Sequence, residues 1–228
     1  DLVLTQEQLN IWLDRLAAVE RFAFDTETTG LNYMDAEIVG VSICTTPGQA
    51  AYIPFGHDYP EAPQQLEQSD VLDQLSVFLN DPKKLVIGQN LKFDLSILAR
   101  YGRTINAPIA DTMLESYVYN SVATRHNMDD LAQKYLGRKT VKFDEIAGKG
   151  VKQRTFNQIE LEAAGDERCR EDTLAVGCQA DVFDVLPVFA VAGLAEIVMP
   201  HHFQSEVVTL LLATADANAM VNAAVKVI

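Results

Sequence analysis

The sequence predicts an α/β domain with a mixed central sheet flanked by helices. Strand patterns come first along the chain, and strands then alternate with helices. The 228 residues suffice for one full domain, or for one domain and a fragment. Hydrophobic residues make up 48% of the chain and charged residues 22%, so we expect it to bury a sizeable core.

The expected elements follow from hydrophobic periodicity and from turn residues. A first helix begins after Thr5, which forms a capping box with Gln8. Four strands are expected, at 21–25, 37–45, 49–55 and 84–88. Helices are expected at 71–80, at 91–101, at 111–136 with a break near 124–126, and again from residue 157. We interpret the basic, glycine-bearing segment 139–153 as a loop.

The composition changes near residue 190, where Ala and Val become frequent and charges become rare. This tail carries no motif of its own and is too apolar for a solvated linker. We therefore expect a boundary near Leu186-Pro187, with one domain at 1–187 and a C-terminal helical stub at 188–228.

Cysteine, histidine and apolar patterns narrow the class of protein. Cys44, Cys169 and Cys178 form no CxxC pair and no disulfide framework, so a reducing, cytoplasmic setting is expected. The four histidines have no zinc-finger spacing. No apolar run is long enough to cross a bilayer and no signal peptide is recognisable, so no membrane partner is expected.

The net charge of −14 argues against broad nucleic-acid binding, which depends on Lys and Arg neutralising phosphates. Carboxylates that hold divalent cations raise the acidic count and reverse the local sign of the field. We therefore expect any contact with nucleic acid to be small and local.

The first of three acidic clusters stands at the exit of a buried strand. Asp25 and Glu27 lie two residues apart, and on extended backbone this spacing points both carboxylates to the same side. They can therefore hold one cation between them. The alternative is a solvated strand end that leads into a turn.

The other two clusters are expected on helices. Asp94 follows the expected N-cap Asn90, and its helical neighbours Leu91 and Leu98 place it on the apolar side. An acid there is costly unless it is paired or metal-bound, although the helix dipole also favours acids near an N-terminus. The helical spacing of its neighbours also predicts that Asp172 points toward the protein interior. The alternative is that it belongs to a charged helix face exposed to solvent.

Separated carboxylates on a strand and two helices, if they converge on one spot, are what two-metal phosphoryl transfer requires. Two Mg²⁺ or Mn²⁺ ions about 4 Å apart would activate a water and stabilise the leaving oxygen. Such hard cations prefer oxygen ligands.

Five segments occur in the order found in the exonuclease domain of bacterial DNA polymerase I: FAFDTETTGL, VIGQNLKFD, DTMLESYVYNSVATRHNMDDLAQKYL, FDEIAGKG and TFNQIELEAAG. The chain resembles that family from about residue 2 to residue 165. The resemblance implies an RNase H-like fold of the DEDD exonuclease superfamily. It also implies two-metal hydrolysis of the terminal phosphodiester at single-stranded or frayed DNA 3′ ends.

The same resemblance implies cofactors, partners and location. The cofactors are two divalent cations, Mg²⁺ or Mn²⁺, with Zn²⁺ as an alternative occupant of one site. The partners are the 3′ end of single-stranded DNA and the remainder of a polymerase chain in cis, in the cytoplasm of a bacterium and near its nucleoid. Residues 196–200 resemble the entry helix of the polymerase domain, but no polymerase active site follows, so we expect no polymerisation.

The resemblance assigns functional roles to those residues of this chain that match the motifs of the family. Asp25 and Glu27 match the first exonuclease motif and Asp94 the second, so the resemblance makes all three metal ligands. The substrate contacts that it implies are Thr26, Leu31, Gln89, Asn90, Lys92, Phe93, Arg125 and Phe143. Aromatic rings stack on bases, and Arg pairs with phosphate, which is consistent with these roles. The alternative for both Phe93 and Phe143 is that their rings belong to the hydrophobic core.

The third motif departs from the family pattern, which is Tyr-x-x-x-Asp after Ala-Gly-Arg. Here Arg168 stands where Tyr is expected, and Asp172 follows four residues later as the ligand. Asp181 is a rival, nine residues further on and about 180° around a helix, so both cannot face the site. A guanidinium cannot accept a hydrogen bond from the attacking water, so we expect weakened hydrolysis.

Two other functions remain open. A catalytically silent domain, kept beside a polymerase as a structural or single-strand-binding module, is favoured by the third motif. An RNA-processing nuclease of the same superfamily is disfavoured by the polymerase-like tail.

Overall fold

The computed structural model describes residues 1–122, 124–137 and 139–168. Within these residues five strands form one sheet in the order β3-β2-β1-β4-β5. They are β1 (Arg21–Thr28), β2 (Ile38–Thr46), β3 (Gln49–Pro54), β4 (Leu85–Gly88) and β5 (Ile109–Asp111). The β2 strand is antiparallel to β1 and β3, whereas β1, β4 and β5 are parallel. The mixed sheet expected from the sequence is confirmed.

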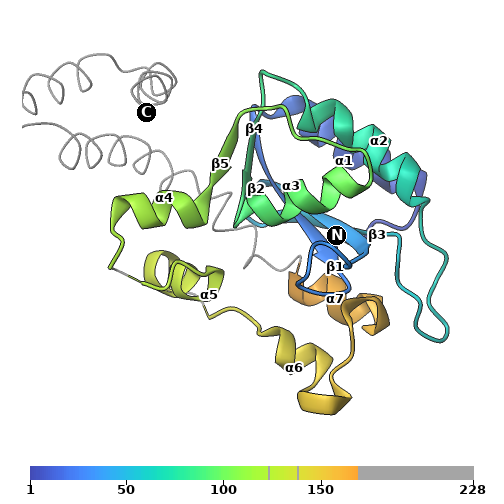
Figure 1. Cartoon of the computed structure of the whole chain (residues 1–228). Helices are drawn as coiled ribbons and strands as arrows, with labels where there is room; N and C mark the ends of the chain where they lie inside the picture. The colour runs from blue at the N-terminus through green and yellow to red at the C-terminus, as the bar shows by residue number, and fades with distance from the viewer. Residues whose placement is uncertain (123, 138, 169–228) are drawn as a thin grey trace, which may run out of the picture.

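One face of the sheet is covered by the helices α1 (Gln6–Ala18), α2 (Gln68–Leu79) and α3 (Leu91–Arg100) (Figure 1). The even-numbered side chains of β1, Phe22 and Phe24, pack in the main apolar core with residues of these helices. Thr5 caps α1 through the predicted capping box with Gln8. Alternation along β1 therefore sends Asp25 and Glu27 to the other face.

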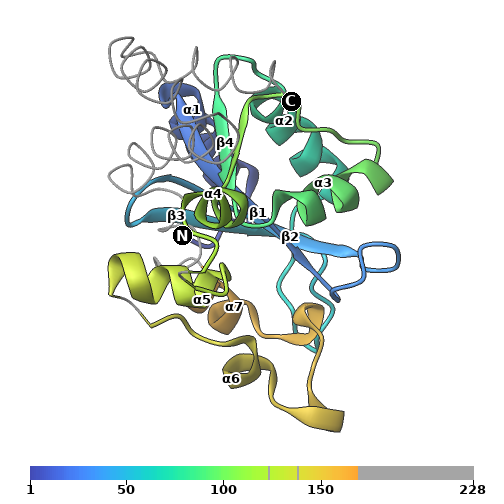
Figure 2. The same ribbon diagram turned by 60° about the vertical axis from the view of Figure 1, so that its left-hand side comes forward.

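The rest of the described chain is a series of shorter helices. After β5 come α4 (Thr112–Tyr119), α5 (Met128–Leu131), the π-helical turn η1 (Ala132–Leu136), α6 (Phe143–Ala147), η2 (Gly150–Lys152), η3 (Phe156–Gln158) and α7 (Leu161–Arg168). Figures 1 and 2 both show α5, α6 and α7 gathered below the sheet. We call residues 139–168 the lower lobe.

The lower lobe is joined to the sheet by its own apolar cluster. Tyr52 of β3 packs there with Phe156, Ile159 and Leu161. This contact places α7 against the face of the sheet that carries Asp25 and Glu27.

Several sequence predictions need correction. The segment 139–153 is not a loop, because α6 and η2 lie within it. The helix expected from 111 begins instead at Thr112, after the short strand β5 that the sequence reading missed. The helix expected from 157 begins at Leu161, after the turn η3.

The predicted boundary near Leu186-Pro187, the stub at 188–228, and the residues Asp172 and Asp181 lie outside the described residues. Among the residues that are described, no helix is long and apolar enough to cross a membrane.

Candidate functional site

The site is built around the end of β1, which runs past its neighbour β4. Residues 21–23 of β1 pair with residues 85–87 of β4, and β4 then ends at Gly88. Beyond that point Asp94 of α3 takes the place of a strand. Its Oδ1 accepts hydrogen bonds from the Thr26 N–H at 2.9 Å and from the Thr26 hydroxyl at 2.6 Å. The second sequence motif is thereby fixed to the first.

Asp94 is only 2% exposed, as its interior placement in the helix predicts. Burial raises the pKa of Asp94 to about 7, against the opposing effect of the Thr26 hydrogen bonds, and the nearby charge of Glu27 raises it further. Two buried carboxyl groups, Glu27 and Asp94, thus repel each other electrostatically, and a bound cation would relieve this repulsion.

Asp25 and Glu27 lie on the opposite side of β1 from the Thr26 side chain. Register places Asp25 opposite Ser42, and Glu27 opposite Gly40, on β2. Ser42 is buried, and its hydroxyl makes no hydrogen bond with the described part of the chain. The buried Ser42 hydroxyl, a potential hydrogen-bond donor, therefore belongs to the residue paired with Asp25 across the two strands.

Asp111 is a structural residue that the sequence reading did not single out. Its Oδ1 accepts from the N–H of Met113 at 3.0 Å and of Asn90 at 3.0 Å, and its Oδ2 accepts from the N–H of Leu91 at 2.8 Å. One carboxylate therefore caps α4 and binds the start of α3. An Asp just before a helical pattern is a known N-cap signal, so Asp111-Thr112 offered a way to find it.

Asn90 occupies the N-cap position of α3, as expected from the sequence. Asn90 adopts a left-handed conformation with φ of 58° and makes no side-chain capping bond. The Asp111 carboxylate already accepts from the backbone at this helix start. The Asn90 side chain is exposed, which suits a contact with a ligand.

Gln89 links the start of α3 to the loop that carries Arg125. Its Nε2 donates to the carbonyl of His126 at 2.8 Å, and its Oε1 accepts from the Thr112 hydroxyl. His126 also pairs with the Ser116 hydroxyl through Nδ1 at 2.9 Å. Both ends of the Gln89 amide thus contact protein, and its role as a DNA contact stays a prediction.

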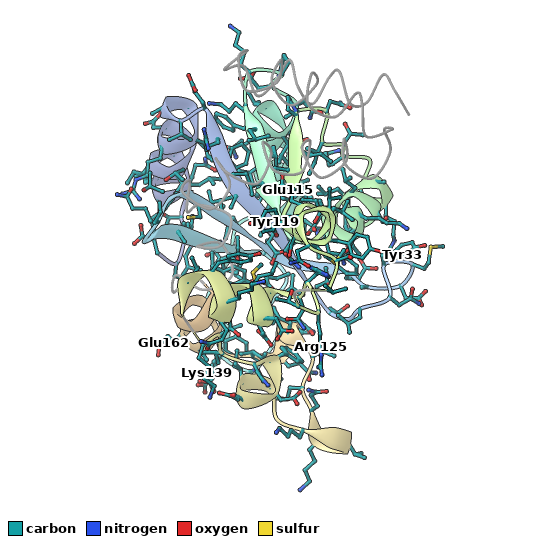
Figure 3. The ribbon with its side chains drawn as sticks, turned by 90° about the vertical axis from the view of Figure 1, so that its left-hand side faces the viewer. Tyr33, Glu115, Tyr119, Arg125, Lys139 and Glu162 are labelled. Atoms are coloured by element: carbon teal, nitrogen blue, oxygen red, sulfur yellow. The ribbon has the colours of Figure 1, made fainter. Side chains whose placement is uncertain are left out.

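The remaining predicted DNA contacts differ in their exposure. Leu31 is 94% exposed in the loop after β1, and Lys92 and Arg125 are exposed. Phe93 and Phe143 are partly buried against apolar clusters, which agrees in part with the core-aromatic alternative. Figure 3 shows Arg125 and Lys139 among the lower helices, and Glu115 on the side of α4 that faces the strands.

The structure does not by itself gather a complete metal centre. Among residues 1–122, 124–137 and 139–168, no three His, Cys, Asp or Glu side chains form a group that could hold a metal ion. The fourth expected ligand, Asp172, is not among the described residues, so the metal assignments stay predictions.

Glu115 is a second acid with a perturbed environment. Burial raises its pKa to about 7, and the Asp111 carboxylate one helical turn away adds to this rise. Its Oε2 is buried and has no hydrogen-bond partner among the described residues. The sequence reading missed Glu115, because DTMLESY reads as an ordinary amphipathic helix.

We expect Glu115→Gln to stabilise the metal-free chain at pH 8 but not at pH 5. The pKa of Glu115 lies above its ordinary value of 4.5 in the folded chain. The free energy of unfolding therefore has its full value at low pH and falls as the pH rises through 7 and the buried carboxyl is forced to ionise. Gln cannot ionise, so the free energy of unfolding of the variant at pH 8 should exceed that of the unmodified chain by on the order of 1–2 kcal/mol. This is less than the full pKa shift would give, because Glu115 is partly exposed. Urea unfolding at both pH values measures this.

The matched control for this experiment is Glu162→Gln, which changes an exposed Glu on α7. It should alter the free energy of unfolding little at either pH. An equal gain for Glu115→Gln at pH 5 and pH 8 would show that ionisation is not the cause.

Comparison with known proteins fits this geometry. The model of a 3'-5' exonuclease family matches residues 1–175. DNA polymerase I of Pseudomonas aeruginosa is 50% identical over 171 residues, which cover 72% of this chain and 18% of that polymerase. The chain therefore spans less than a fifth of the length of this relative.

Solved structures share the fold at low sequence identity. RNase D of Trypanosoma brucei aligns with a TM-score of 0.61 at 16% identity, over 84% of this chain and 69% of that one. Escherichia coli RNase D aligns with a TM-score of 0.58 at 15% identity, over 95% and 50%. These likenesses show that the fold is RNase H-like, as predicted. The family match over residues 1–175 and the similarity to the Pseudomonas polymerase establish that the chain belongs to the 3'-5' exonuclease family found as the exonuclease domain of bacterial DNA polymerase I.

Proposed function

We propose that the chain hydrolyses the terminal phosphodiester of single-stranded or frayed DNA 3′ ends, using two divalent cations held by Asp25, Glu27, Asp94 and Asp172. The observation that carries the proposal is the strand end of β1. There Asp25 and Glu27 share one face, and the buried Asp94 is fixed beside them by Thr26.

The donor set fits hard cations. The three described carboxylates offer oxygen ligands, and burial, with a smaller effect from the charge of Glu27, raises the pKa of Asp94 in the absence of a cation. When bound, Mg²⁺ or Mn²⁺ would supply a nucleophilic water and stabilise charge on the leaving oxygen. Among the protein's own residues, Thr26 holds the Asp94 carboxylate in place through its N–H and its hydroxyl.

The proposed path of the DNA strand uses the exposed groups around this end. Leu31 stands against the terminal base, and Lys92 and Arg125 pair with phosphates. Phe93 and Phe143 offer ring faces for stacking, and Thr26, Gln89 and Asn90 lie near the 3′ nucleotide. Arg125 is held in position by the bond from Gln89 to the His126 carbonyl.

One segment of the lower lobe, residues 139–154, is locally basic in this acidic protein. Residues 139–154 contain five Lys or Arg and only two Asp or Glu, in a chain with a net charge of −14. Lys142, Lys149 and Lys152 are exposed. We infer that the lobe binds the phosphates of the incoming strand, and that a short local contact of this kind favours single strands over duplex.

We expect the chain to degrade single-stranded DNA much faster than blunt duplex, and only from the 3′ end. Oligonucleotides labelled at the 5′ terminus, single-stranded or annealed, measure both properties. Equal rates on the two substrates, or shortening from the 5′ end, would contradict the proposal.

Lys149→Ala with Lys152→Ala should weaken binding of single-stranded DNA and flatten its salt dependence. Each lost phosphate contact is expected to reduce the slope of log affinity against log salt by about 0.7. Fluorescence anisotropy with an oligonucleotide at several salt concentrations measures the slope. The control is Lys83→Ala, an exposed Lys outside the lobe, which should leave the slope unchanged.

The relatives are parts of bacterial DNA polymerases, which supports two further proposals. The remainder of a polymerase chain is proposed as the partner in cis, and the bacterial cytoplasm near the nucleoid as the location.

A further inference from the structure

Tyr52 lies over the main-chain position directly opposite Glu27. It is fully buried in β3, and its ring leans across β2 onto Gly40. A Cβ on Gly40 would lie only 2.5 Å from the Tyr52 hydroxyl oxygen. Gly40 is the cross-strand partner of Glu27, so the space that a side chain at this position would fill is occupied by the Tyr52 hydroxyl.

The Tyr52 hydroxyl is fixed by a hydrogen-bond chain that ends in the lower lobe. It lies 2.6 Å from His57 Nε2, and His57 Nδ1 lies 3.0 Å from the carbonyl oxygen of Ile159. A carbonyl can only accept, so Nδ1 carries the proton and donates it. Burial lowers the pKa of His57, which favours the neutral ring, and Nε2 therefore accepts from Tyr52.

Aromatic packing continues the same connection. The Phe156 ring contacts both Tyr52 and His57 edge-on or tilted, with centroids 6.1 and 5.6 Å away. Phe143, a proposed DNA contact, stacks on Phe156 at 6.4 Å. Tyr52 thus stands between Glu27 and the lobe that carries Phe143 and α7.

We propose that Tyr52 is a positioning residue for Glu27, locked by His57, and that it couples the Glu27 carboxylate to the placement of the lower lobe. The inference rests on the proposed function, in which Glu27 is a metal ligand. Partners that orient a metal-ligating carboxylate affect metal affinity without touching the metal. The glycine at position 40 is required because any side chain would displace the Tyr52 hydroxyl.

The test compares Tyr52→Phe with Tyr59→Phe. Tyr59 belongs to the same apolar cluster, its ring lies edge-on to His57 at 6.2 Å, and its hydroxyl accepts from the N–H of Leu161 at 3.2 Å. Each variant therefore loses one hydroxyl and one hydrogen bond in the same region, but Tyr52 alone lies over Gly40.

Both variants should lower the melting temperature of the 228-residue chain by a similar amount. Titration calorimetry with Mn²⁺ should show a dissociation constant about 10-fold higher for Tyr52→Phe and an unchanged one for Tyr59→Phe. Gly40→Ala should share the defect of Tyr52→Phe. In a Glu27→Gln background, Tyr52→Phe should cause no further loss of Mn²⁺ affinity.

The outcomes separate this inference from the proposed function. If Glu27→Gln weakens Mn²⁺ binding but Tyr52→Phe does not, the positioning role is refuted and the metal site stands. If Tyr59→Phe weakens it equally, the effect is general loss of structure and the positioning role is again refuted. If Glu27→Gln leaves Mn²⁺ binding unchanged, both proposals fail together.

Discussion

Asp25→Ala is expected to lower the rate of 3′→5′ hydrolysis by about 10³ and to abolish Mn²⁺ binding. A cation that acts as a Lewis acid contributes several kcal/mol to the barrier, and about 4 kcal/mol corresponds to roughly 10³ in rate. Asp25 and Glu27 share one face of β1, so the loss of Asp25 removes one of the two ligands proposed for that face.

Calorimetry and single-turnover hydrolysis of an oligonucleotide measure these two effects. The control is Asp14→Ala, which removes an exposed acid from α1 on the other side of the sheet and should change neither quantity. Retention of Mn²⁺ affinity in Asp25→Ala would contradict the assignment of the first motif.

The second large effect is expected at the third motif. Asp172→Ala should abolish the remaining hydrolysis, while Asp181→Ala should be silent. Asp172 follows Arg168, the last described residue of α7, by four residues, and α7 packs on the sheet face that carries Asp25.

Arg168→Tyr should raise the rate in the same assay. A Tyr hydroxyl can accept a hydrogen bond from the attacking water, and a positioned acid–base group commonly contributes about 10²–10⁴ in rate. Damage by Asp181→Ala together with a silent Asp172→Ala would reverse the register. A rate that is unchanged by Arg168→Tyr would show that water orientation does not limit this chain.

The sequence predicted best where local chemistry and burial agree. Asp94 could be placed in the interior because Leu91 and Leu98 share its helix face, and the structure buries it. The pair Asp25 and Glu27 could be placed on one side because strand alternation is strict. Thr5 and Gln8 form the expected capping box because both partners lie within one turn.

Long-range contacts were beyond such reasoning. Nothing local indicates that Asp111 binds the start of α3, because its partners lie about twenty residues earlier in the chain. The same holds for the contact of Gln89 with His126 and for that of Tyr52 with Gly40. The segment 139–153 was predicted to be a loop because its helices are short and are stabilised by packing against Phe156 rather than by their own periodicity.

A silent domain that binds single strands without cutting them is the alternative function. It would share the fold, the basic segment 139–154 and the exposed Leu31 with an active exonuclease. It differs in the chemistry at the end of β1, so binding measurements alone cannot separate the two.

The most direct measurement is the ladder of products from a 5′-labelled single-stranded oligonucleotide incubated with the chain in Mg²⁺. An active two-cation exonuclease should shorten the strand one nucleotide at a time from the 3′ end, release nucleoside monophosphates, and stop in EDTA or when Asp25 is replaced by Ala. Binding of the oligonucleotide without any ladder, or a ladder that persists in EDTA, would contradict the account.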